Sequence, residues 1–274
     1  MNEAGKLAIR MVEKPWGQDR LPPPFAAPPR QRIGEIWFEP QPPLDALLVK
    51  YLFTSEALSV QVHPSDDQTR AAGLGPQGKE ECWLIVAAEP GARIGIGFNA
   101  AIDSGALRRA ALDGSIERLL TWHDVAPGDF FYIPANTVHA IGGGVSLIEI
   151  QQNSDITYRL YDYGRPRELH LDAGLAVARG QPYDEALHRR LRPDEAATLV
   201  DGPFFRLERV AGVPGRGTID RFAGAPALVV PLDGTVRCGD CAVRPGECGW
   251  VAEVAGVDWP AGGASLLAQP LAAS

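Results

Sequence analysis

The sequence lacks any stretch that approaches the roughly 20 consecutive apolar residues of a membrane-spanning helix. It has only four cysteines and no signal-like start, which is typical of a protein kept in a reducing cytoplasm. Basic residues are in the minority, with 26 Lys and Arg against 34 Asp and Glu, so the net charge is −8. Nucleic acids and anionic membranes are bound largely through basic surfaces, and we therefore expect neither as a partner.

The remaining composition is that of an ordinary soluble globular protein, with 45% hydrophobic and 22% charged residues. A chain of 274 residues forms one large domain or two small ones and buries roughly 75% of its unfolded surface. The negative net charge does not exclude an anionic small molecule as ligand, because a local pocket of Lys and Arg suffices to bind one.

A succession of short strands and turns runs through residues 128–159. The first run, 130–133, is aromatic and β-branched and lies between a glycine and a proline, which is typical of a strand. Two further strands are predicted within 138–150, separated by three consecutive glycines. His139 and Glu149 are therefore predicted on strands, which hold side chains more rigidly than loops do.

Two upstream strands carry polar residues that complement His139. Gln61 and His63 are two positions apart and so share one face, and Glu81 shares a face with Trp83. Imidazole nitrogens and a carboxylate together suit a borderline cation such as zinc, and three or four protein ligands leave a position open for water or substrate. We predict His63, Glu81 and His139 as ligands, with Gln61 as a neutral fourth. On spacing alone, unrelated polar residues on a half-buried sheet are an equal alternative, about one to one.

The motifs also resemble a known family. Gly128, Pro134 and His139 have the spacing of the second motif of the cupin β-barrels, and Asn136, where that motif has glycine, still tolerates a left-handed turn. A larger set of matches within residues 34–177 resembles the type I mannose-6-phosphate isomerases, most closely their short bacterial form. The matching segments are Gly34–Trp37, Leu58–Pro64, Gly78–Trp83, Tyr132–Ala140 and Gln151–Asp162.

The resemblance implies a zinc-dependent aldose–ketose isomerase, with one Zn²⁺ per chain, that interconverts mannose 6-phosphate and fructose 6-phosphate. It implies a mainly β fold of two cupin-type (jelly-roll) β-barrels with a few short helices and the metal site in the first barrel. We predict the catalytic barrel over residues 1–178, a connector over 179–200 and a metal-free, cupin-like lobe over 201–274. Short strands at turn-marked intervals and the lack of histidine after residue 188 support the last of these.

The resemblance also implies roles for individual residues. Arg159 matches the family's active-site arginine, whose fork suits a diol or a phosphate. Lys79 would grip the phosphate or, with a lowered pKa, transfer protons, and Ser59 would contact the phosphate. Glu149 precedes Arg159 and would either orient it or act in proton transfer, with a purely structural role equally favoured. The identity of the base that moves the proton between C1 and C2 stays open.

Two local patterns complete the predictions. Residues 103–120 show the apolar stripe of a helix, with Ser104 as its N-cap. Cys238 and Cys241, with Cys248 beyond, have the spacing of a zinc knuckle or a redox pair. A structural zinc site needs four ligands and a redox motif normally opens a helix, so we favour small residues at a hairpin turn.

Two other functions fit the same scaffold. One is an enzyme of different specificity, such as an isomerase or epimerase of another phosphosugar, or an iron dioxygenase. The other is a non-enzymatic cupin that binds a sugar phosphate or a metal. Lys79 and Arg159 favour a phosphorylated polyol as substrate and so favour the isomerase. We expect a cytoplasmic protein that is a monomer or a weak homodimer.

Overall fold

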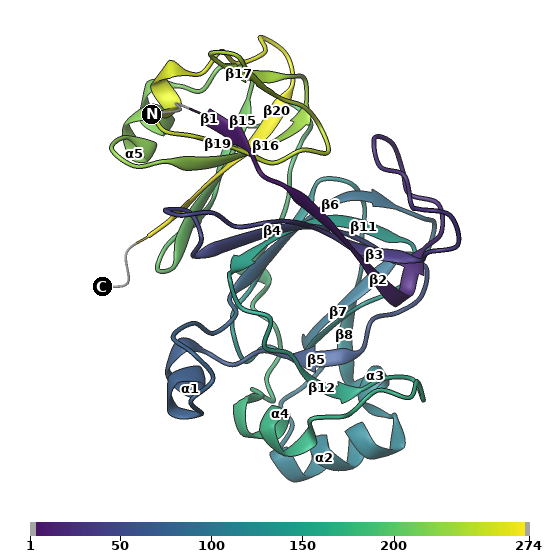
Figure 1. The fold of residues 1–274 in the computed structure, drawn as a ribbon. Coiled ribbons are helices and arrows are strands. Elements are labelled where there is room, and N and C mark those ends of the chain that lie inside the picture. Colours follow the sequence, from purple (N-terminus) through teal and green to yellow (C-terminus); the bar gives the residue numbers. More distant parts are fainter. Residues whose placement is uncertain (1–3, 272–274) are drawn as a thin grey trace.

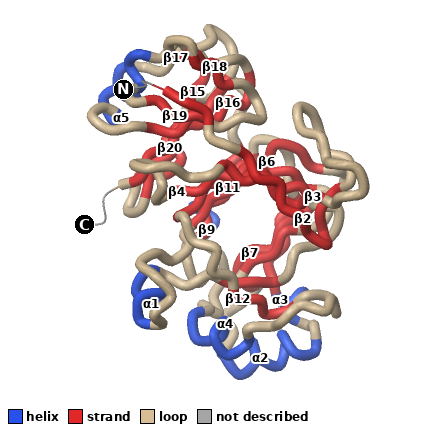
Figure 2. Tube along the Cα trace, in the orientation of Figure 1, coloured by secondary structure: helices blue, strands red, loops and turns tan. Residues whose placement is uncertain are grey.

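The computed structural model describes residues 4–271, and β-strands dominate it, which confirms the predicted mainly β fold (Figure 1). Three large sheets form successive layers, and the helices lie toward the periphery of the molecule (Figure 2). In the part of the chain that the structure describes, no helix is long and apolar enough to cross a membrane.

The central layer is a seven-stranded antiparallel sheet. Side chains alternate along its middle strands: Tyr51 and Phe53 belong to a hydrophobic cluster on one face, and Leu52 belongs to a cluster on the other. In spatial order its strands are β13 (His188–Arg190), β9 (Asp129–Ile133), β6 (Glu81–Ala88), β11 (Val145–Gln152), β4 (Leu47–Phe53), β3 (Ile33–Phe38) and β2 (Ile9–Gln18).

A five-stranded sheet faces the inner side of the central layer. Between the two sheets pack large apolar side chains such as Trp83, Phe131 and Leu147. The two sheets form a jelly-roll sandwich, with no closed ring of hydrogen-bonded strands among residues 4–271. In spatial order the strands of this second sheet are β12 (Tyr158–Tyr161), β5 (Val60–Val62), β10 (His139–Ile141), β7 (Arg93–Phe98) and β8 (Leu120–Asp124).

The C-terminal lobe is built on a six-stranded sheet that also contains the most N-terminal strand. Figure 1 shows this strand, β1, beside the C-terminal strands. In spatial order the strands of this sheet are β1 (Ala4–Lys6), β19 (Gly249–Val251), β16 (Ala227–Asp233), β20 (Ala264–Pro270), β15 (Phe205–Ala211) and β14 (Ala197–Asp201). The lobe also contains the helix α5 (Arg216–Phe222), the 3₁₀ turn Val254–Gly256 and a separate hairpin of β17 (Val236–Cys238) and β18 (Cys241–Val243).

The two lobes share a continuous apolar core. The outer face of the central sheet, including Tyr51 and Ile148, packs against Phe205, Leu228 and other residues of the six-stranded sheet. The predicted connector contributes β13 to the central sheet and β14 to the six-stranded one. The predicted domain boundaries stay a prediction. β1 lies within the predicted N-terminal domain in the sequence, but it pairs with β19 of the C-terminal lobe.

The helix predicted over 103–120 is wrong in extent. The chain forms α2 (Ser104–Asp113) and α3 (Ile116–Leu119), and Gly114 between them has a left-handed φ of 78° that ends the first helix. Asp103, not Ser104, is the N-cap, because its side chain accepts a hydrogen bond from the Ala106 amide.

Helices cover the outer face of the five-stranded sheet. Side chains of α2, such as Leu107, and of α4 (Leu171–Val177), such as Leu175, pack with Val62 of β5 and Leu160 of β12. The remaining short elements are α1 (Asp66–Ala71) and the 3₁₀ turn Glu185–Leu187.

The cysteine pair lies at a hairpin, as we favoured from the sequence. Cys238 and Cys241 are directly opposite one another in β17 and β18, and Gly239 in the intervening turn has a φ of 53°. Neither residue belongs to a metal-ligating cluster among residues 4–271.

A buried carboxylate joins the segment predicted as the connector to the N-terminal lobe. Asp129 on β9 receives two hydrogen bonds of 2.7 and 2.6 Å from Arg190, and it also contacts the Ala126 amide and His188. Burial alone would raise the pKa of Asp129, but these donors outweigh it and hold the pKa below its usual range.

We expect Asp129→Asn to destabilise the fold at pH 7 by about 1–3 kcal/mol, because the charge-assisted hydrogen bonds are lost. The folded-state pKa lies below the unfolded value of roughly 4, so the carboxylate's contribution is present above pH 4 and is lost as the pH falls through the folded pKa. Urea unfolding at pH 7 and pH 3 measures this, and the variant should lose less stability on acidification than the wild type. Asp240→Asn at an exposed turn is the control, and equal effects of the two substitutions would contradict the assignment.

Candidate metal centre and active site

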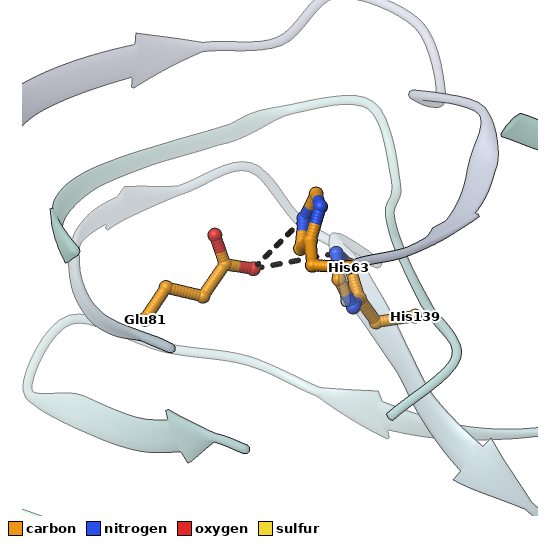
Figure 3. Close-up of side chains that lie close together, drawn as sticks. All are labelled: His63, Glu81 and His139. Carbon is orange, nitrogen blue, oxygen red and sulfur yellow. Dashed lines mark ion pairs between the residues drawn. The ribbon is translucent and has the colours of Figure 1, made fainter. Parts of the chain in front are cut away.

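The three predicted metal ligands meet between the two sheets of the N-terminal lobe (Figure 3). Glu81 is the first residue of β6 in the central sheet, whereas His139 begins β10 and His63 directly follows β5 in the opposite sheet. The register pairs His139 with Gln61 across β10 and β5, so the two histidine-bearing segments lie side by side. Residues that are 76 positions apart along the chain, from 63 to 139, thus converge on one point.

The ligand atoms are close enough to share one ion. Glu81 Oε1 lies 3.6 Å from His63 Nε2 and 3.3 Å from His139 Nε2, and the three ligand atoms are all within 4.8 Å of one another. All three side chains are buried. Figure 3 shows the carboxylate of Glu81 pointing toward both imidazoles.

The second nitrogen of each imidazole is held by a backbone carbonyl. His63 Nδ1 lies 2.9 Å from the Ile156 carbonyl, and His139 Nδ1 lies 3.0 Å from the Thr137 carbonyl. A carbonyl oxygen only accepts, so each Nδ1 carries the proton and each Nε2 keeps its lone pair. This is the usual way in which a protein orients histidine ligands toward a metal.

The electrostatics of the cluster suit a cation. Burial, followed by the charge of Lys79, lowers the pKa of His139 to about 3, so the imidazole is neutral. Burial raises the pKa of Glu81 to about 8, an effect that a cation beside the carboxylate would reverse. Oε1 of Glu81 is buried without a hydrogen-bond donor among residues 4–271. An acceptor in this state fits a metal ligand, because buried polar atoms otherwise find donors.

Gln61 lies beside the cluster rather than within it. Its amide nitrogen is 3.2 Å from His139 Nε2, and its oxygen is 3.3 Å from the Ser59 hydroxyl, which donates to it. Its role as fourth ligand remains a prediction, and it requires the amide oxygen to turn toward the histidines.

Lys79 and Glu149 lie next to the cluster. The ammonium of Lys79 is 2.6 Å from Glu81 Oε2, 3.2 Å from His63 Nε2 and 3.8 Å from Glu149 Oε1. Burial alone would lower the pKa of Lys79, but Glu149 and Glu81 outweigh it and hold the pKa above its usual range. Without a cation beside Glu81 the lysine is therefore an ammonium, whereas a metal ion held by Glu81 would act to lower the pKa of Lys79.

Glu149 contacts two lysines and a tryptophan. Lys50 Nζ lies 3.1 Å from its Oε1, and the Trp83 indole N–H donates to its Oε2 at 3.2 Å. Burial would raise the pKa of Glu149, but Lys50 and Lys79 lower it to about 2, so the group is a carboxylate at neutral pH.

A cavity of about 210 Å³ brings the predicted substrate-binding residues together. Ser59, Lys79, Glu149 and Arg159 all line it. Arg159 donates from one terminal nitrogen to the Glu168 carbonyl, while its Nε has no hydrogen-bond partner among residues 4–271.

The lining of the cavity carries more positive than negative charge. Arg167, which also lines the cavity, pairs with the buried Asp162 through two hydrogen bonds of 2.6 Å, and Arg165 lies 3.0 Å from the same carboxylate. The lining has five basic side chains (Lys14, Lys50, Lys79, Arg159 and Arg167) and three acidic ones (Glu35, Glu149 and Asp155), a balance that suits an anionic substrate.

Sequence reasoning missed several residues of the cavity, of which Lys50 is the most prominent. Lys50 is buried in β4, directly opposite Glu149 in β11, and its ammonium also lies over the Trp37 ring, 4.3 Å from the ring centroid. A lysine within an otherwise apolar strand was the available signal, since lysine is almost never fully buried unless it is paired. The other missed lining residues that carry charge are Lys14, Glu35, Asp155 and Arg167.

Comparison with known proteins supports the resemblance, although no family model matches the chain. A mannose-6-phosphate isomerase from Streptococcus mutans is 35% identical over 241 residues, which is 73% of this chain and 76% of that protein. The mannose-6-phosphate isomerase ManA of Bacillus subtilis is 40% identical over 168 residues, or 58% of this chain. That match spans about half of the Bacillus protein, 53% of its length.

Solved structures share the fold over nearly the whole chain. The mannose 6-phosphate isomerase from Bacillus subtilis superimposes with a TM-score of 0.75 at 23% identity, covering 98% of this chain and 100% of that one. A zinc-bound mannose 6-phosphate isomerase superimposes with a TM-score of 0.72 at 14% identity, covering 98% of this chain and 100% of that one.

The jelly-roll sandwich with a buried His–Glu–His cluster between its sheets defines a protein of the cupin class with a candidate metal site. The sequence identity to the Streptococcus relative, and the share of both chains that the match covers, show which family of this class the chain represents. The chain belongs to the mannose-6-phosphate isomerase family.

Proposed function

We propose that the protein interconverts mannose 6-phosphate and fructose 6-phosphate through an enediol, with one zinc ion held by His63, Glu81 and His139. The observation that carries the proposal is the convergence of these three ligand atoms beside a cavity lined by Lys79, Glu149 and other charged groups. Relatives and structural neighbours with this activity in their names support it. The zinc-bound neighbour and the donor set of the cluster support zinc as the metal.

A bound zinc ion would supply positive charge close to the oxygen on which negative charge develops. The protein's own groups would hold the open-chain sugar phosphate and move its protons. In the forward direction a base removes the proton from C2, which gives an enediolate, and a proton is then delivered to C1 while another passes from the C2 oxygen to the C1 oxygen.

Glu149 is the group that we assign to transfer of the carbon-bound proton. It is a buried carboxylate in the cavity, and Lys50 and Lys79 keep it ionised at neutral pH, which is the state that a base requires. Its contacts with Lys50, Lys79 and Trp83 hold its position. The alternative role suggested by the sequence, orientation of Arg159, is less favoured, because these three residues and not the arginine are its partners.

Lys79 and Arg159 would stabilise charge on the substrate. Lys79 is an ammonium beside both the metal ligands and Glu149, so it can donate hydrogen bonds to an oxygen of the enediolate. Arg159, with its unpaired Nε and the neighbouring Arg167, would bind the phosphate or a distal hydroxyl, and Ser59 would add a polar contact.

The activity is tested by incubating purified, zinc-loaded protein with mannose 6-phosphate and coupling fructose 6-phosphate to a dye-linked assay. We expect turnover with mannose 6-phosphate and little with unphosphorylated mannose, because the charge balance of the cavity lining suits an anion. Glucose 6-phosphate, which differs only at C2, tests whether the site selects one epimer. Absence of turnover with mannose 6-phosphate by the zinc-loaded protein would contradict the proposal.

We also propose that the protein is cytoplasmic, as the cysteine content predicted, and that it is a monomer or weak homodimer. Light scattering after gel filtration tests the oligomeric state, and a stable tetramer or larger assembly would contradict it.

A further inference from the structure

We propose that Gln151 is a positioning residue that shares the ammonium of Lys50 with Glu149, keeps it from closing onto Glu149 and thereby sets the geometry of proton transfer. The inference rests on the proposed function, since it assigns a task within that reaction. Gln151 lies on β11, two residues beyond Glu149, and its side chain is completely buried. Because side chains two apart on a strand share a face, Glu149 and Gln151 both point toward the space between the two sheets.

The amide of Gln151 can adopt only one orientation. Its Nε2 donates to the carbonyls of Gln152 and Ser154, each at 2.7 Å, and its Oε1 accepts from Lys50 Nζ at 2.7 Å. Rotating the amide by 180° would place its oxygen against two carbonyl oxygens and its N–H groups against an ammonium. The backbone therefore directs the amide oxygen toward Lys50.

Lys50 is held from three sides in this arrangement. Gln151 Oε1 is 2.7 Å from its ammonium, Glu149 Oε1 is 3.1 Å away, and the Trp37 ring lies beneath it. The shorter of the two hydrogen bonds is the one to Gln151. Without that acceptor, the ammonium would move toward Glu149 and pair with it alone, because an isolated buried cation seeks its nearest carboxylate.

Glu149 would respond to such a shift because two lysines contact the same oxygen. Lys79 Nζ lies 3.8 Å from Glu149 Oε1, the atom that Lys50 also contacts. A closer Lys50 would turn or withdraw the carboxylate from the substrate and weaken it as a base. We therefore expect loss of Gln151 to lower kcat more than it raises KM.

Gln151 also fixes the turn that follows β11. The Ser154 carbonyl that it binds lies two residues before Ile156, whose carbonyl orients His63, and one residue before Asp155, which lines the cavity. One buried side chain thus connects the lysine–glutamate pair with the turn that orients a predicted metal ligand.

The test uses Gln151→Met, which keeps the length of the side chain and removes both hydrogen-bonding functions. The matched control is Gln269→Met in the C-terminal lobe, a buried glutamine whose Nε2 donates to backbone carbonyls, among them that of Ala225 at 2.9 Å. Both variants should lower Tm by a few degrees, about 2–8 °C, because each loses buried hydrogen bonds. Only Gln151→Met should lower kcat, by about tenfold or more, with KM within about threefold of wild type.

A double-mutant cycle with Lys50→Met distinguishes positioning from general structural support. If Gln151 acts through Lys50, adding Gln151→Met to Lys50→Met should change kcat by less than about twofold. Should Gln151→Met fail to fold, Gln151→Asn withdraws the amide oxygen by one methylene and is interpreted in the same way. If Lys50→Met leaves no measurable turnover, the role of Gln151 is decided by comparing the kcat of Gln151→Met with that of Gln269→Met.

A kcat of Gln151→Met within threefold of wild type, or fully additive effects in the cycle, would overturn the inference while leaving the isomerase proposal intact. Wild-type protein that does not turn over mannose 6-phosphate would overturn both.

Discussion

Replacing His139 by alanine is expected to lower kcat/KM for mannose 6-phosphate isomerisation by at least about 1,000-fold and to abolish stoichiometric zinc binding. The imidazole is one of the three predicted metal ligands that converge within residues 4–271, and its Nε2 lies 3.3 Å from the Glu81 carboxylate. Alanine leaves a cavity and an incomplete donor set, so the remaining groups cannot hold the ion. Zinc content by mass spectrometry and kcat/KM from the coupled assay measure the two effects.

The matched control is His123→Ala, which removes a partly buried histidine from β8 of the same five-stranded sheet. We expect this variant to keep its zinc and its activity within about threefold, because an isolated substitution outside the site usually changes stability only. A His139→Ala protein that retains one zinc per chain and wild-type turnover would show that the metal, if catalytic, is held elsewhere.

Lys79→Met is expected to lower kcat by about 10² to 10⁴-fold while zinc remains bound. The ammonium is buried between the predicted metal ligands and Glu149. Methionine therefore removes a charge from the place where we propose that the enediolate forms, but leaves all three predicted ligand side chains in position. The combination of retained zinc and lost turnover separates this residue from His139.

Lys6→Met serves as the control for Lys79→Met, because Lys6 forms only an exposed ion pair with Glu247 in the C-terminal lobe. That pair should contribute about 0–1 kcal/mol to stability and nothing to catalysis. If Lys79→Met instead keeps kcat within threefold of wild type, the lysine has a binding or structural role at most.

The cluster of His63, Glu81 and His139 could be predicted from the sequence because its residues follow the strand period. Glu81 and Trp83 share a face, as do Gln61 and His63, and in the structure these faces point toward the space between the sheets. The order of the motifs also supplied the family, which the relatives then confirmed. The spacing of these residues in the sequence alone gave no reason to prefer metal ligands over unrelated polar residues. That reason comes from the orphaned Glu81 oxygen and the two carbonyls that fix the imidazole tautomers.

Features that depend on long-range pairing were not accessible from the sequence. Lys50 reads as one polar residue in an apolar strand, and only the register of β4 against β11 places it opposite Glu149. Likewise, β1 is three residues long and joins a sheet whose other strands begin almost 200 residues later, so no local pattern indicates its place. The broken helix is different, because the sequence itself contains Gly114, and glycine readily adopts the left-handed conformation that ends a helix.

The proposed metal centre is tested most directly by a zinc titration of chelator-treated protein, followed by the isomerase assay at each step. We expect metal-free protein to be nearly inactive with mannose 6-phosphate, and activity to rise in proportion to bound zinc and level off at one ion per chain. The assignment of His63, Glu81 and His139 as the single metal site of the proposed reaction predicts this stoichiometry. Full turnover by metal-free protein, or activity that continues to rise well beyond one zinc per chain, would contradict it.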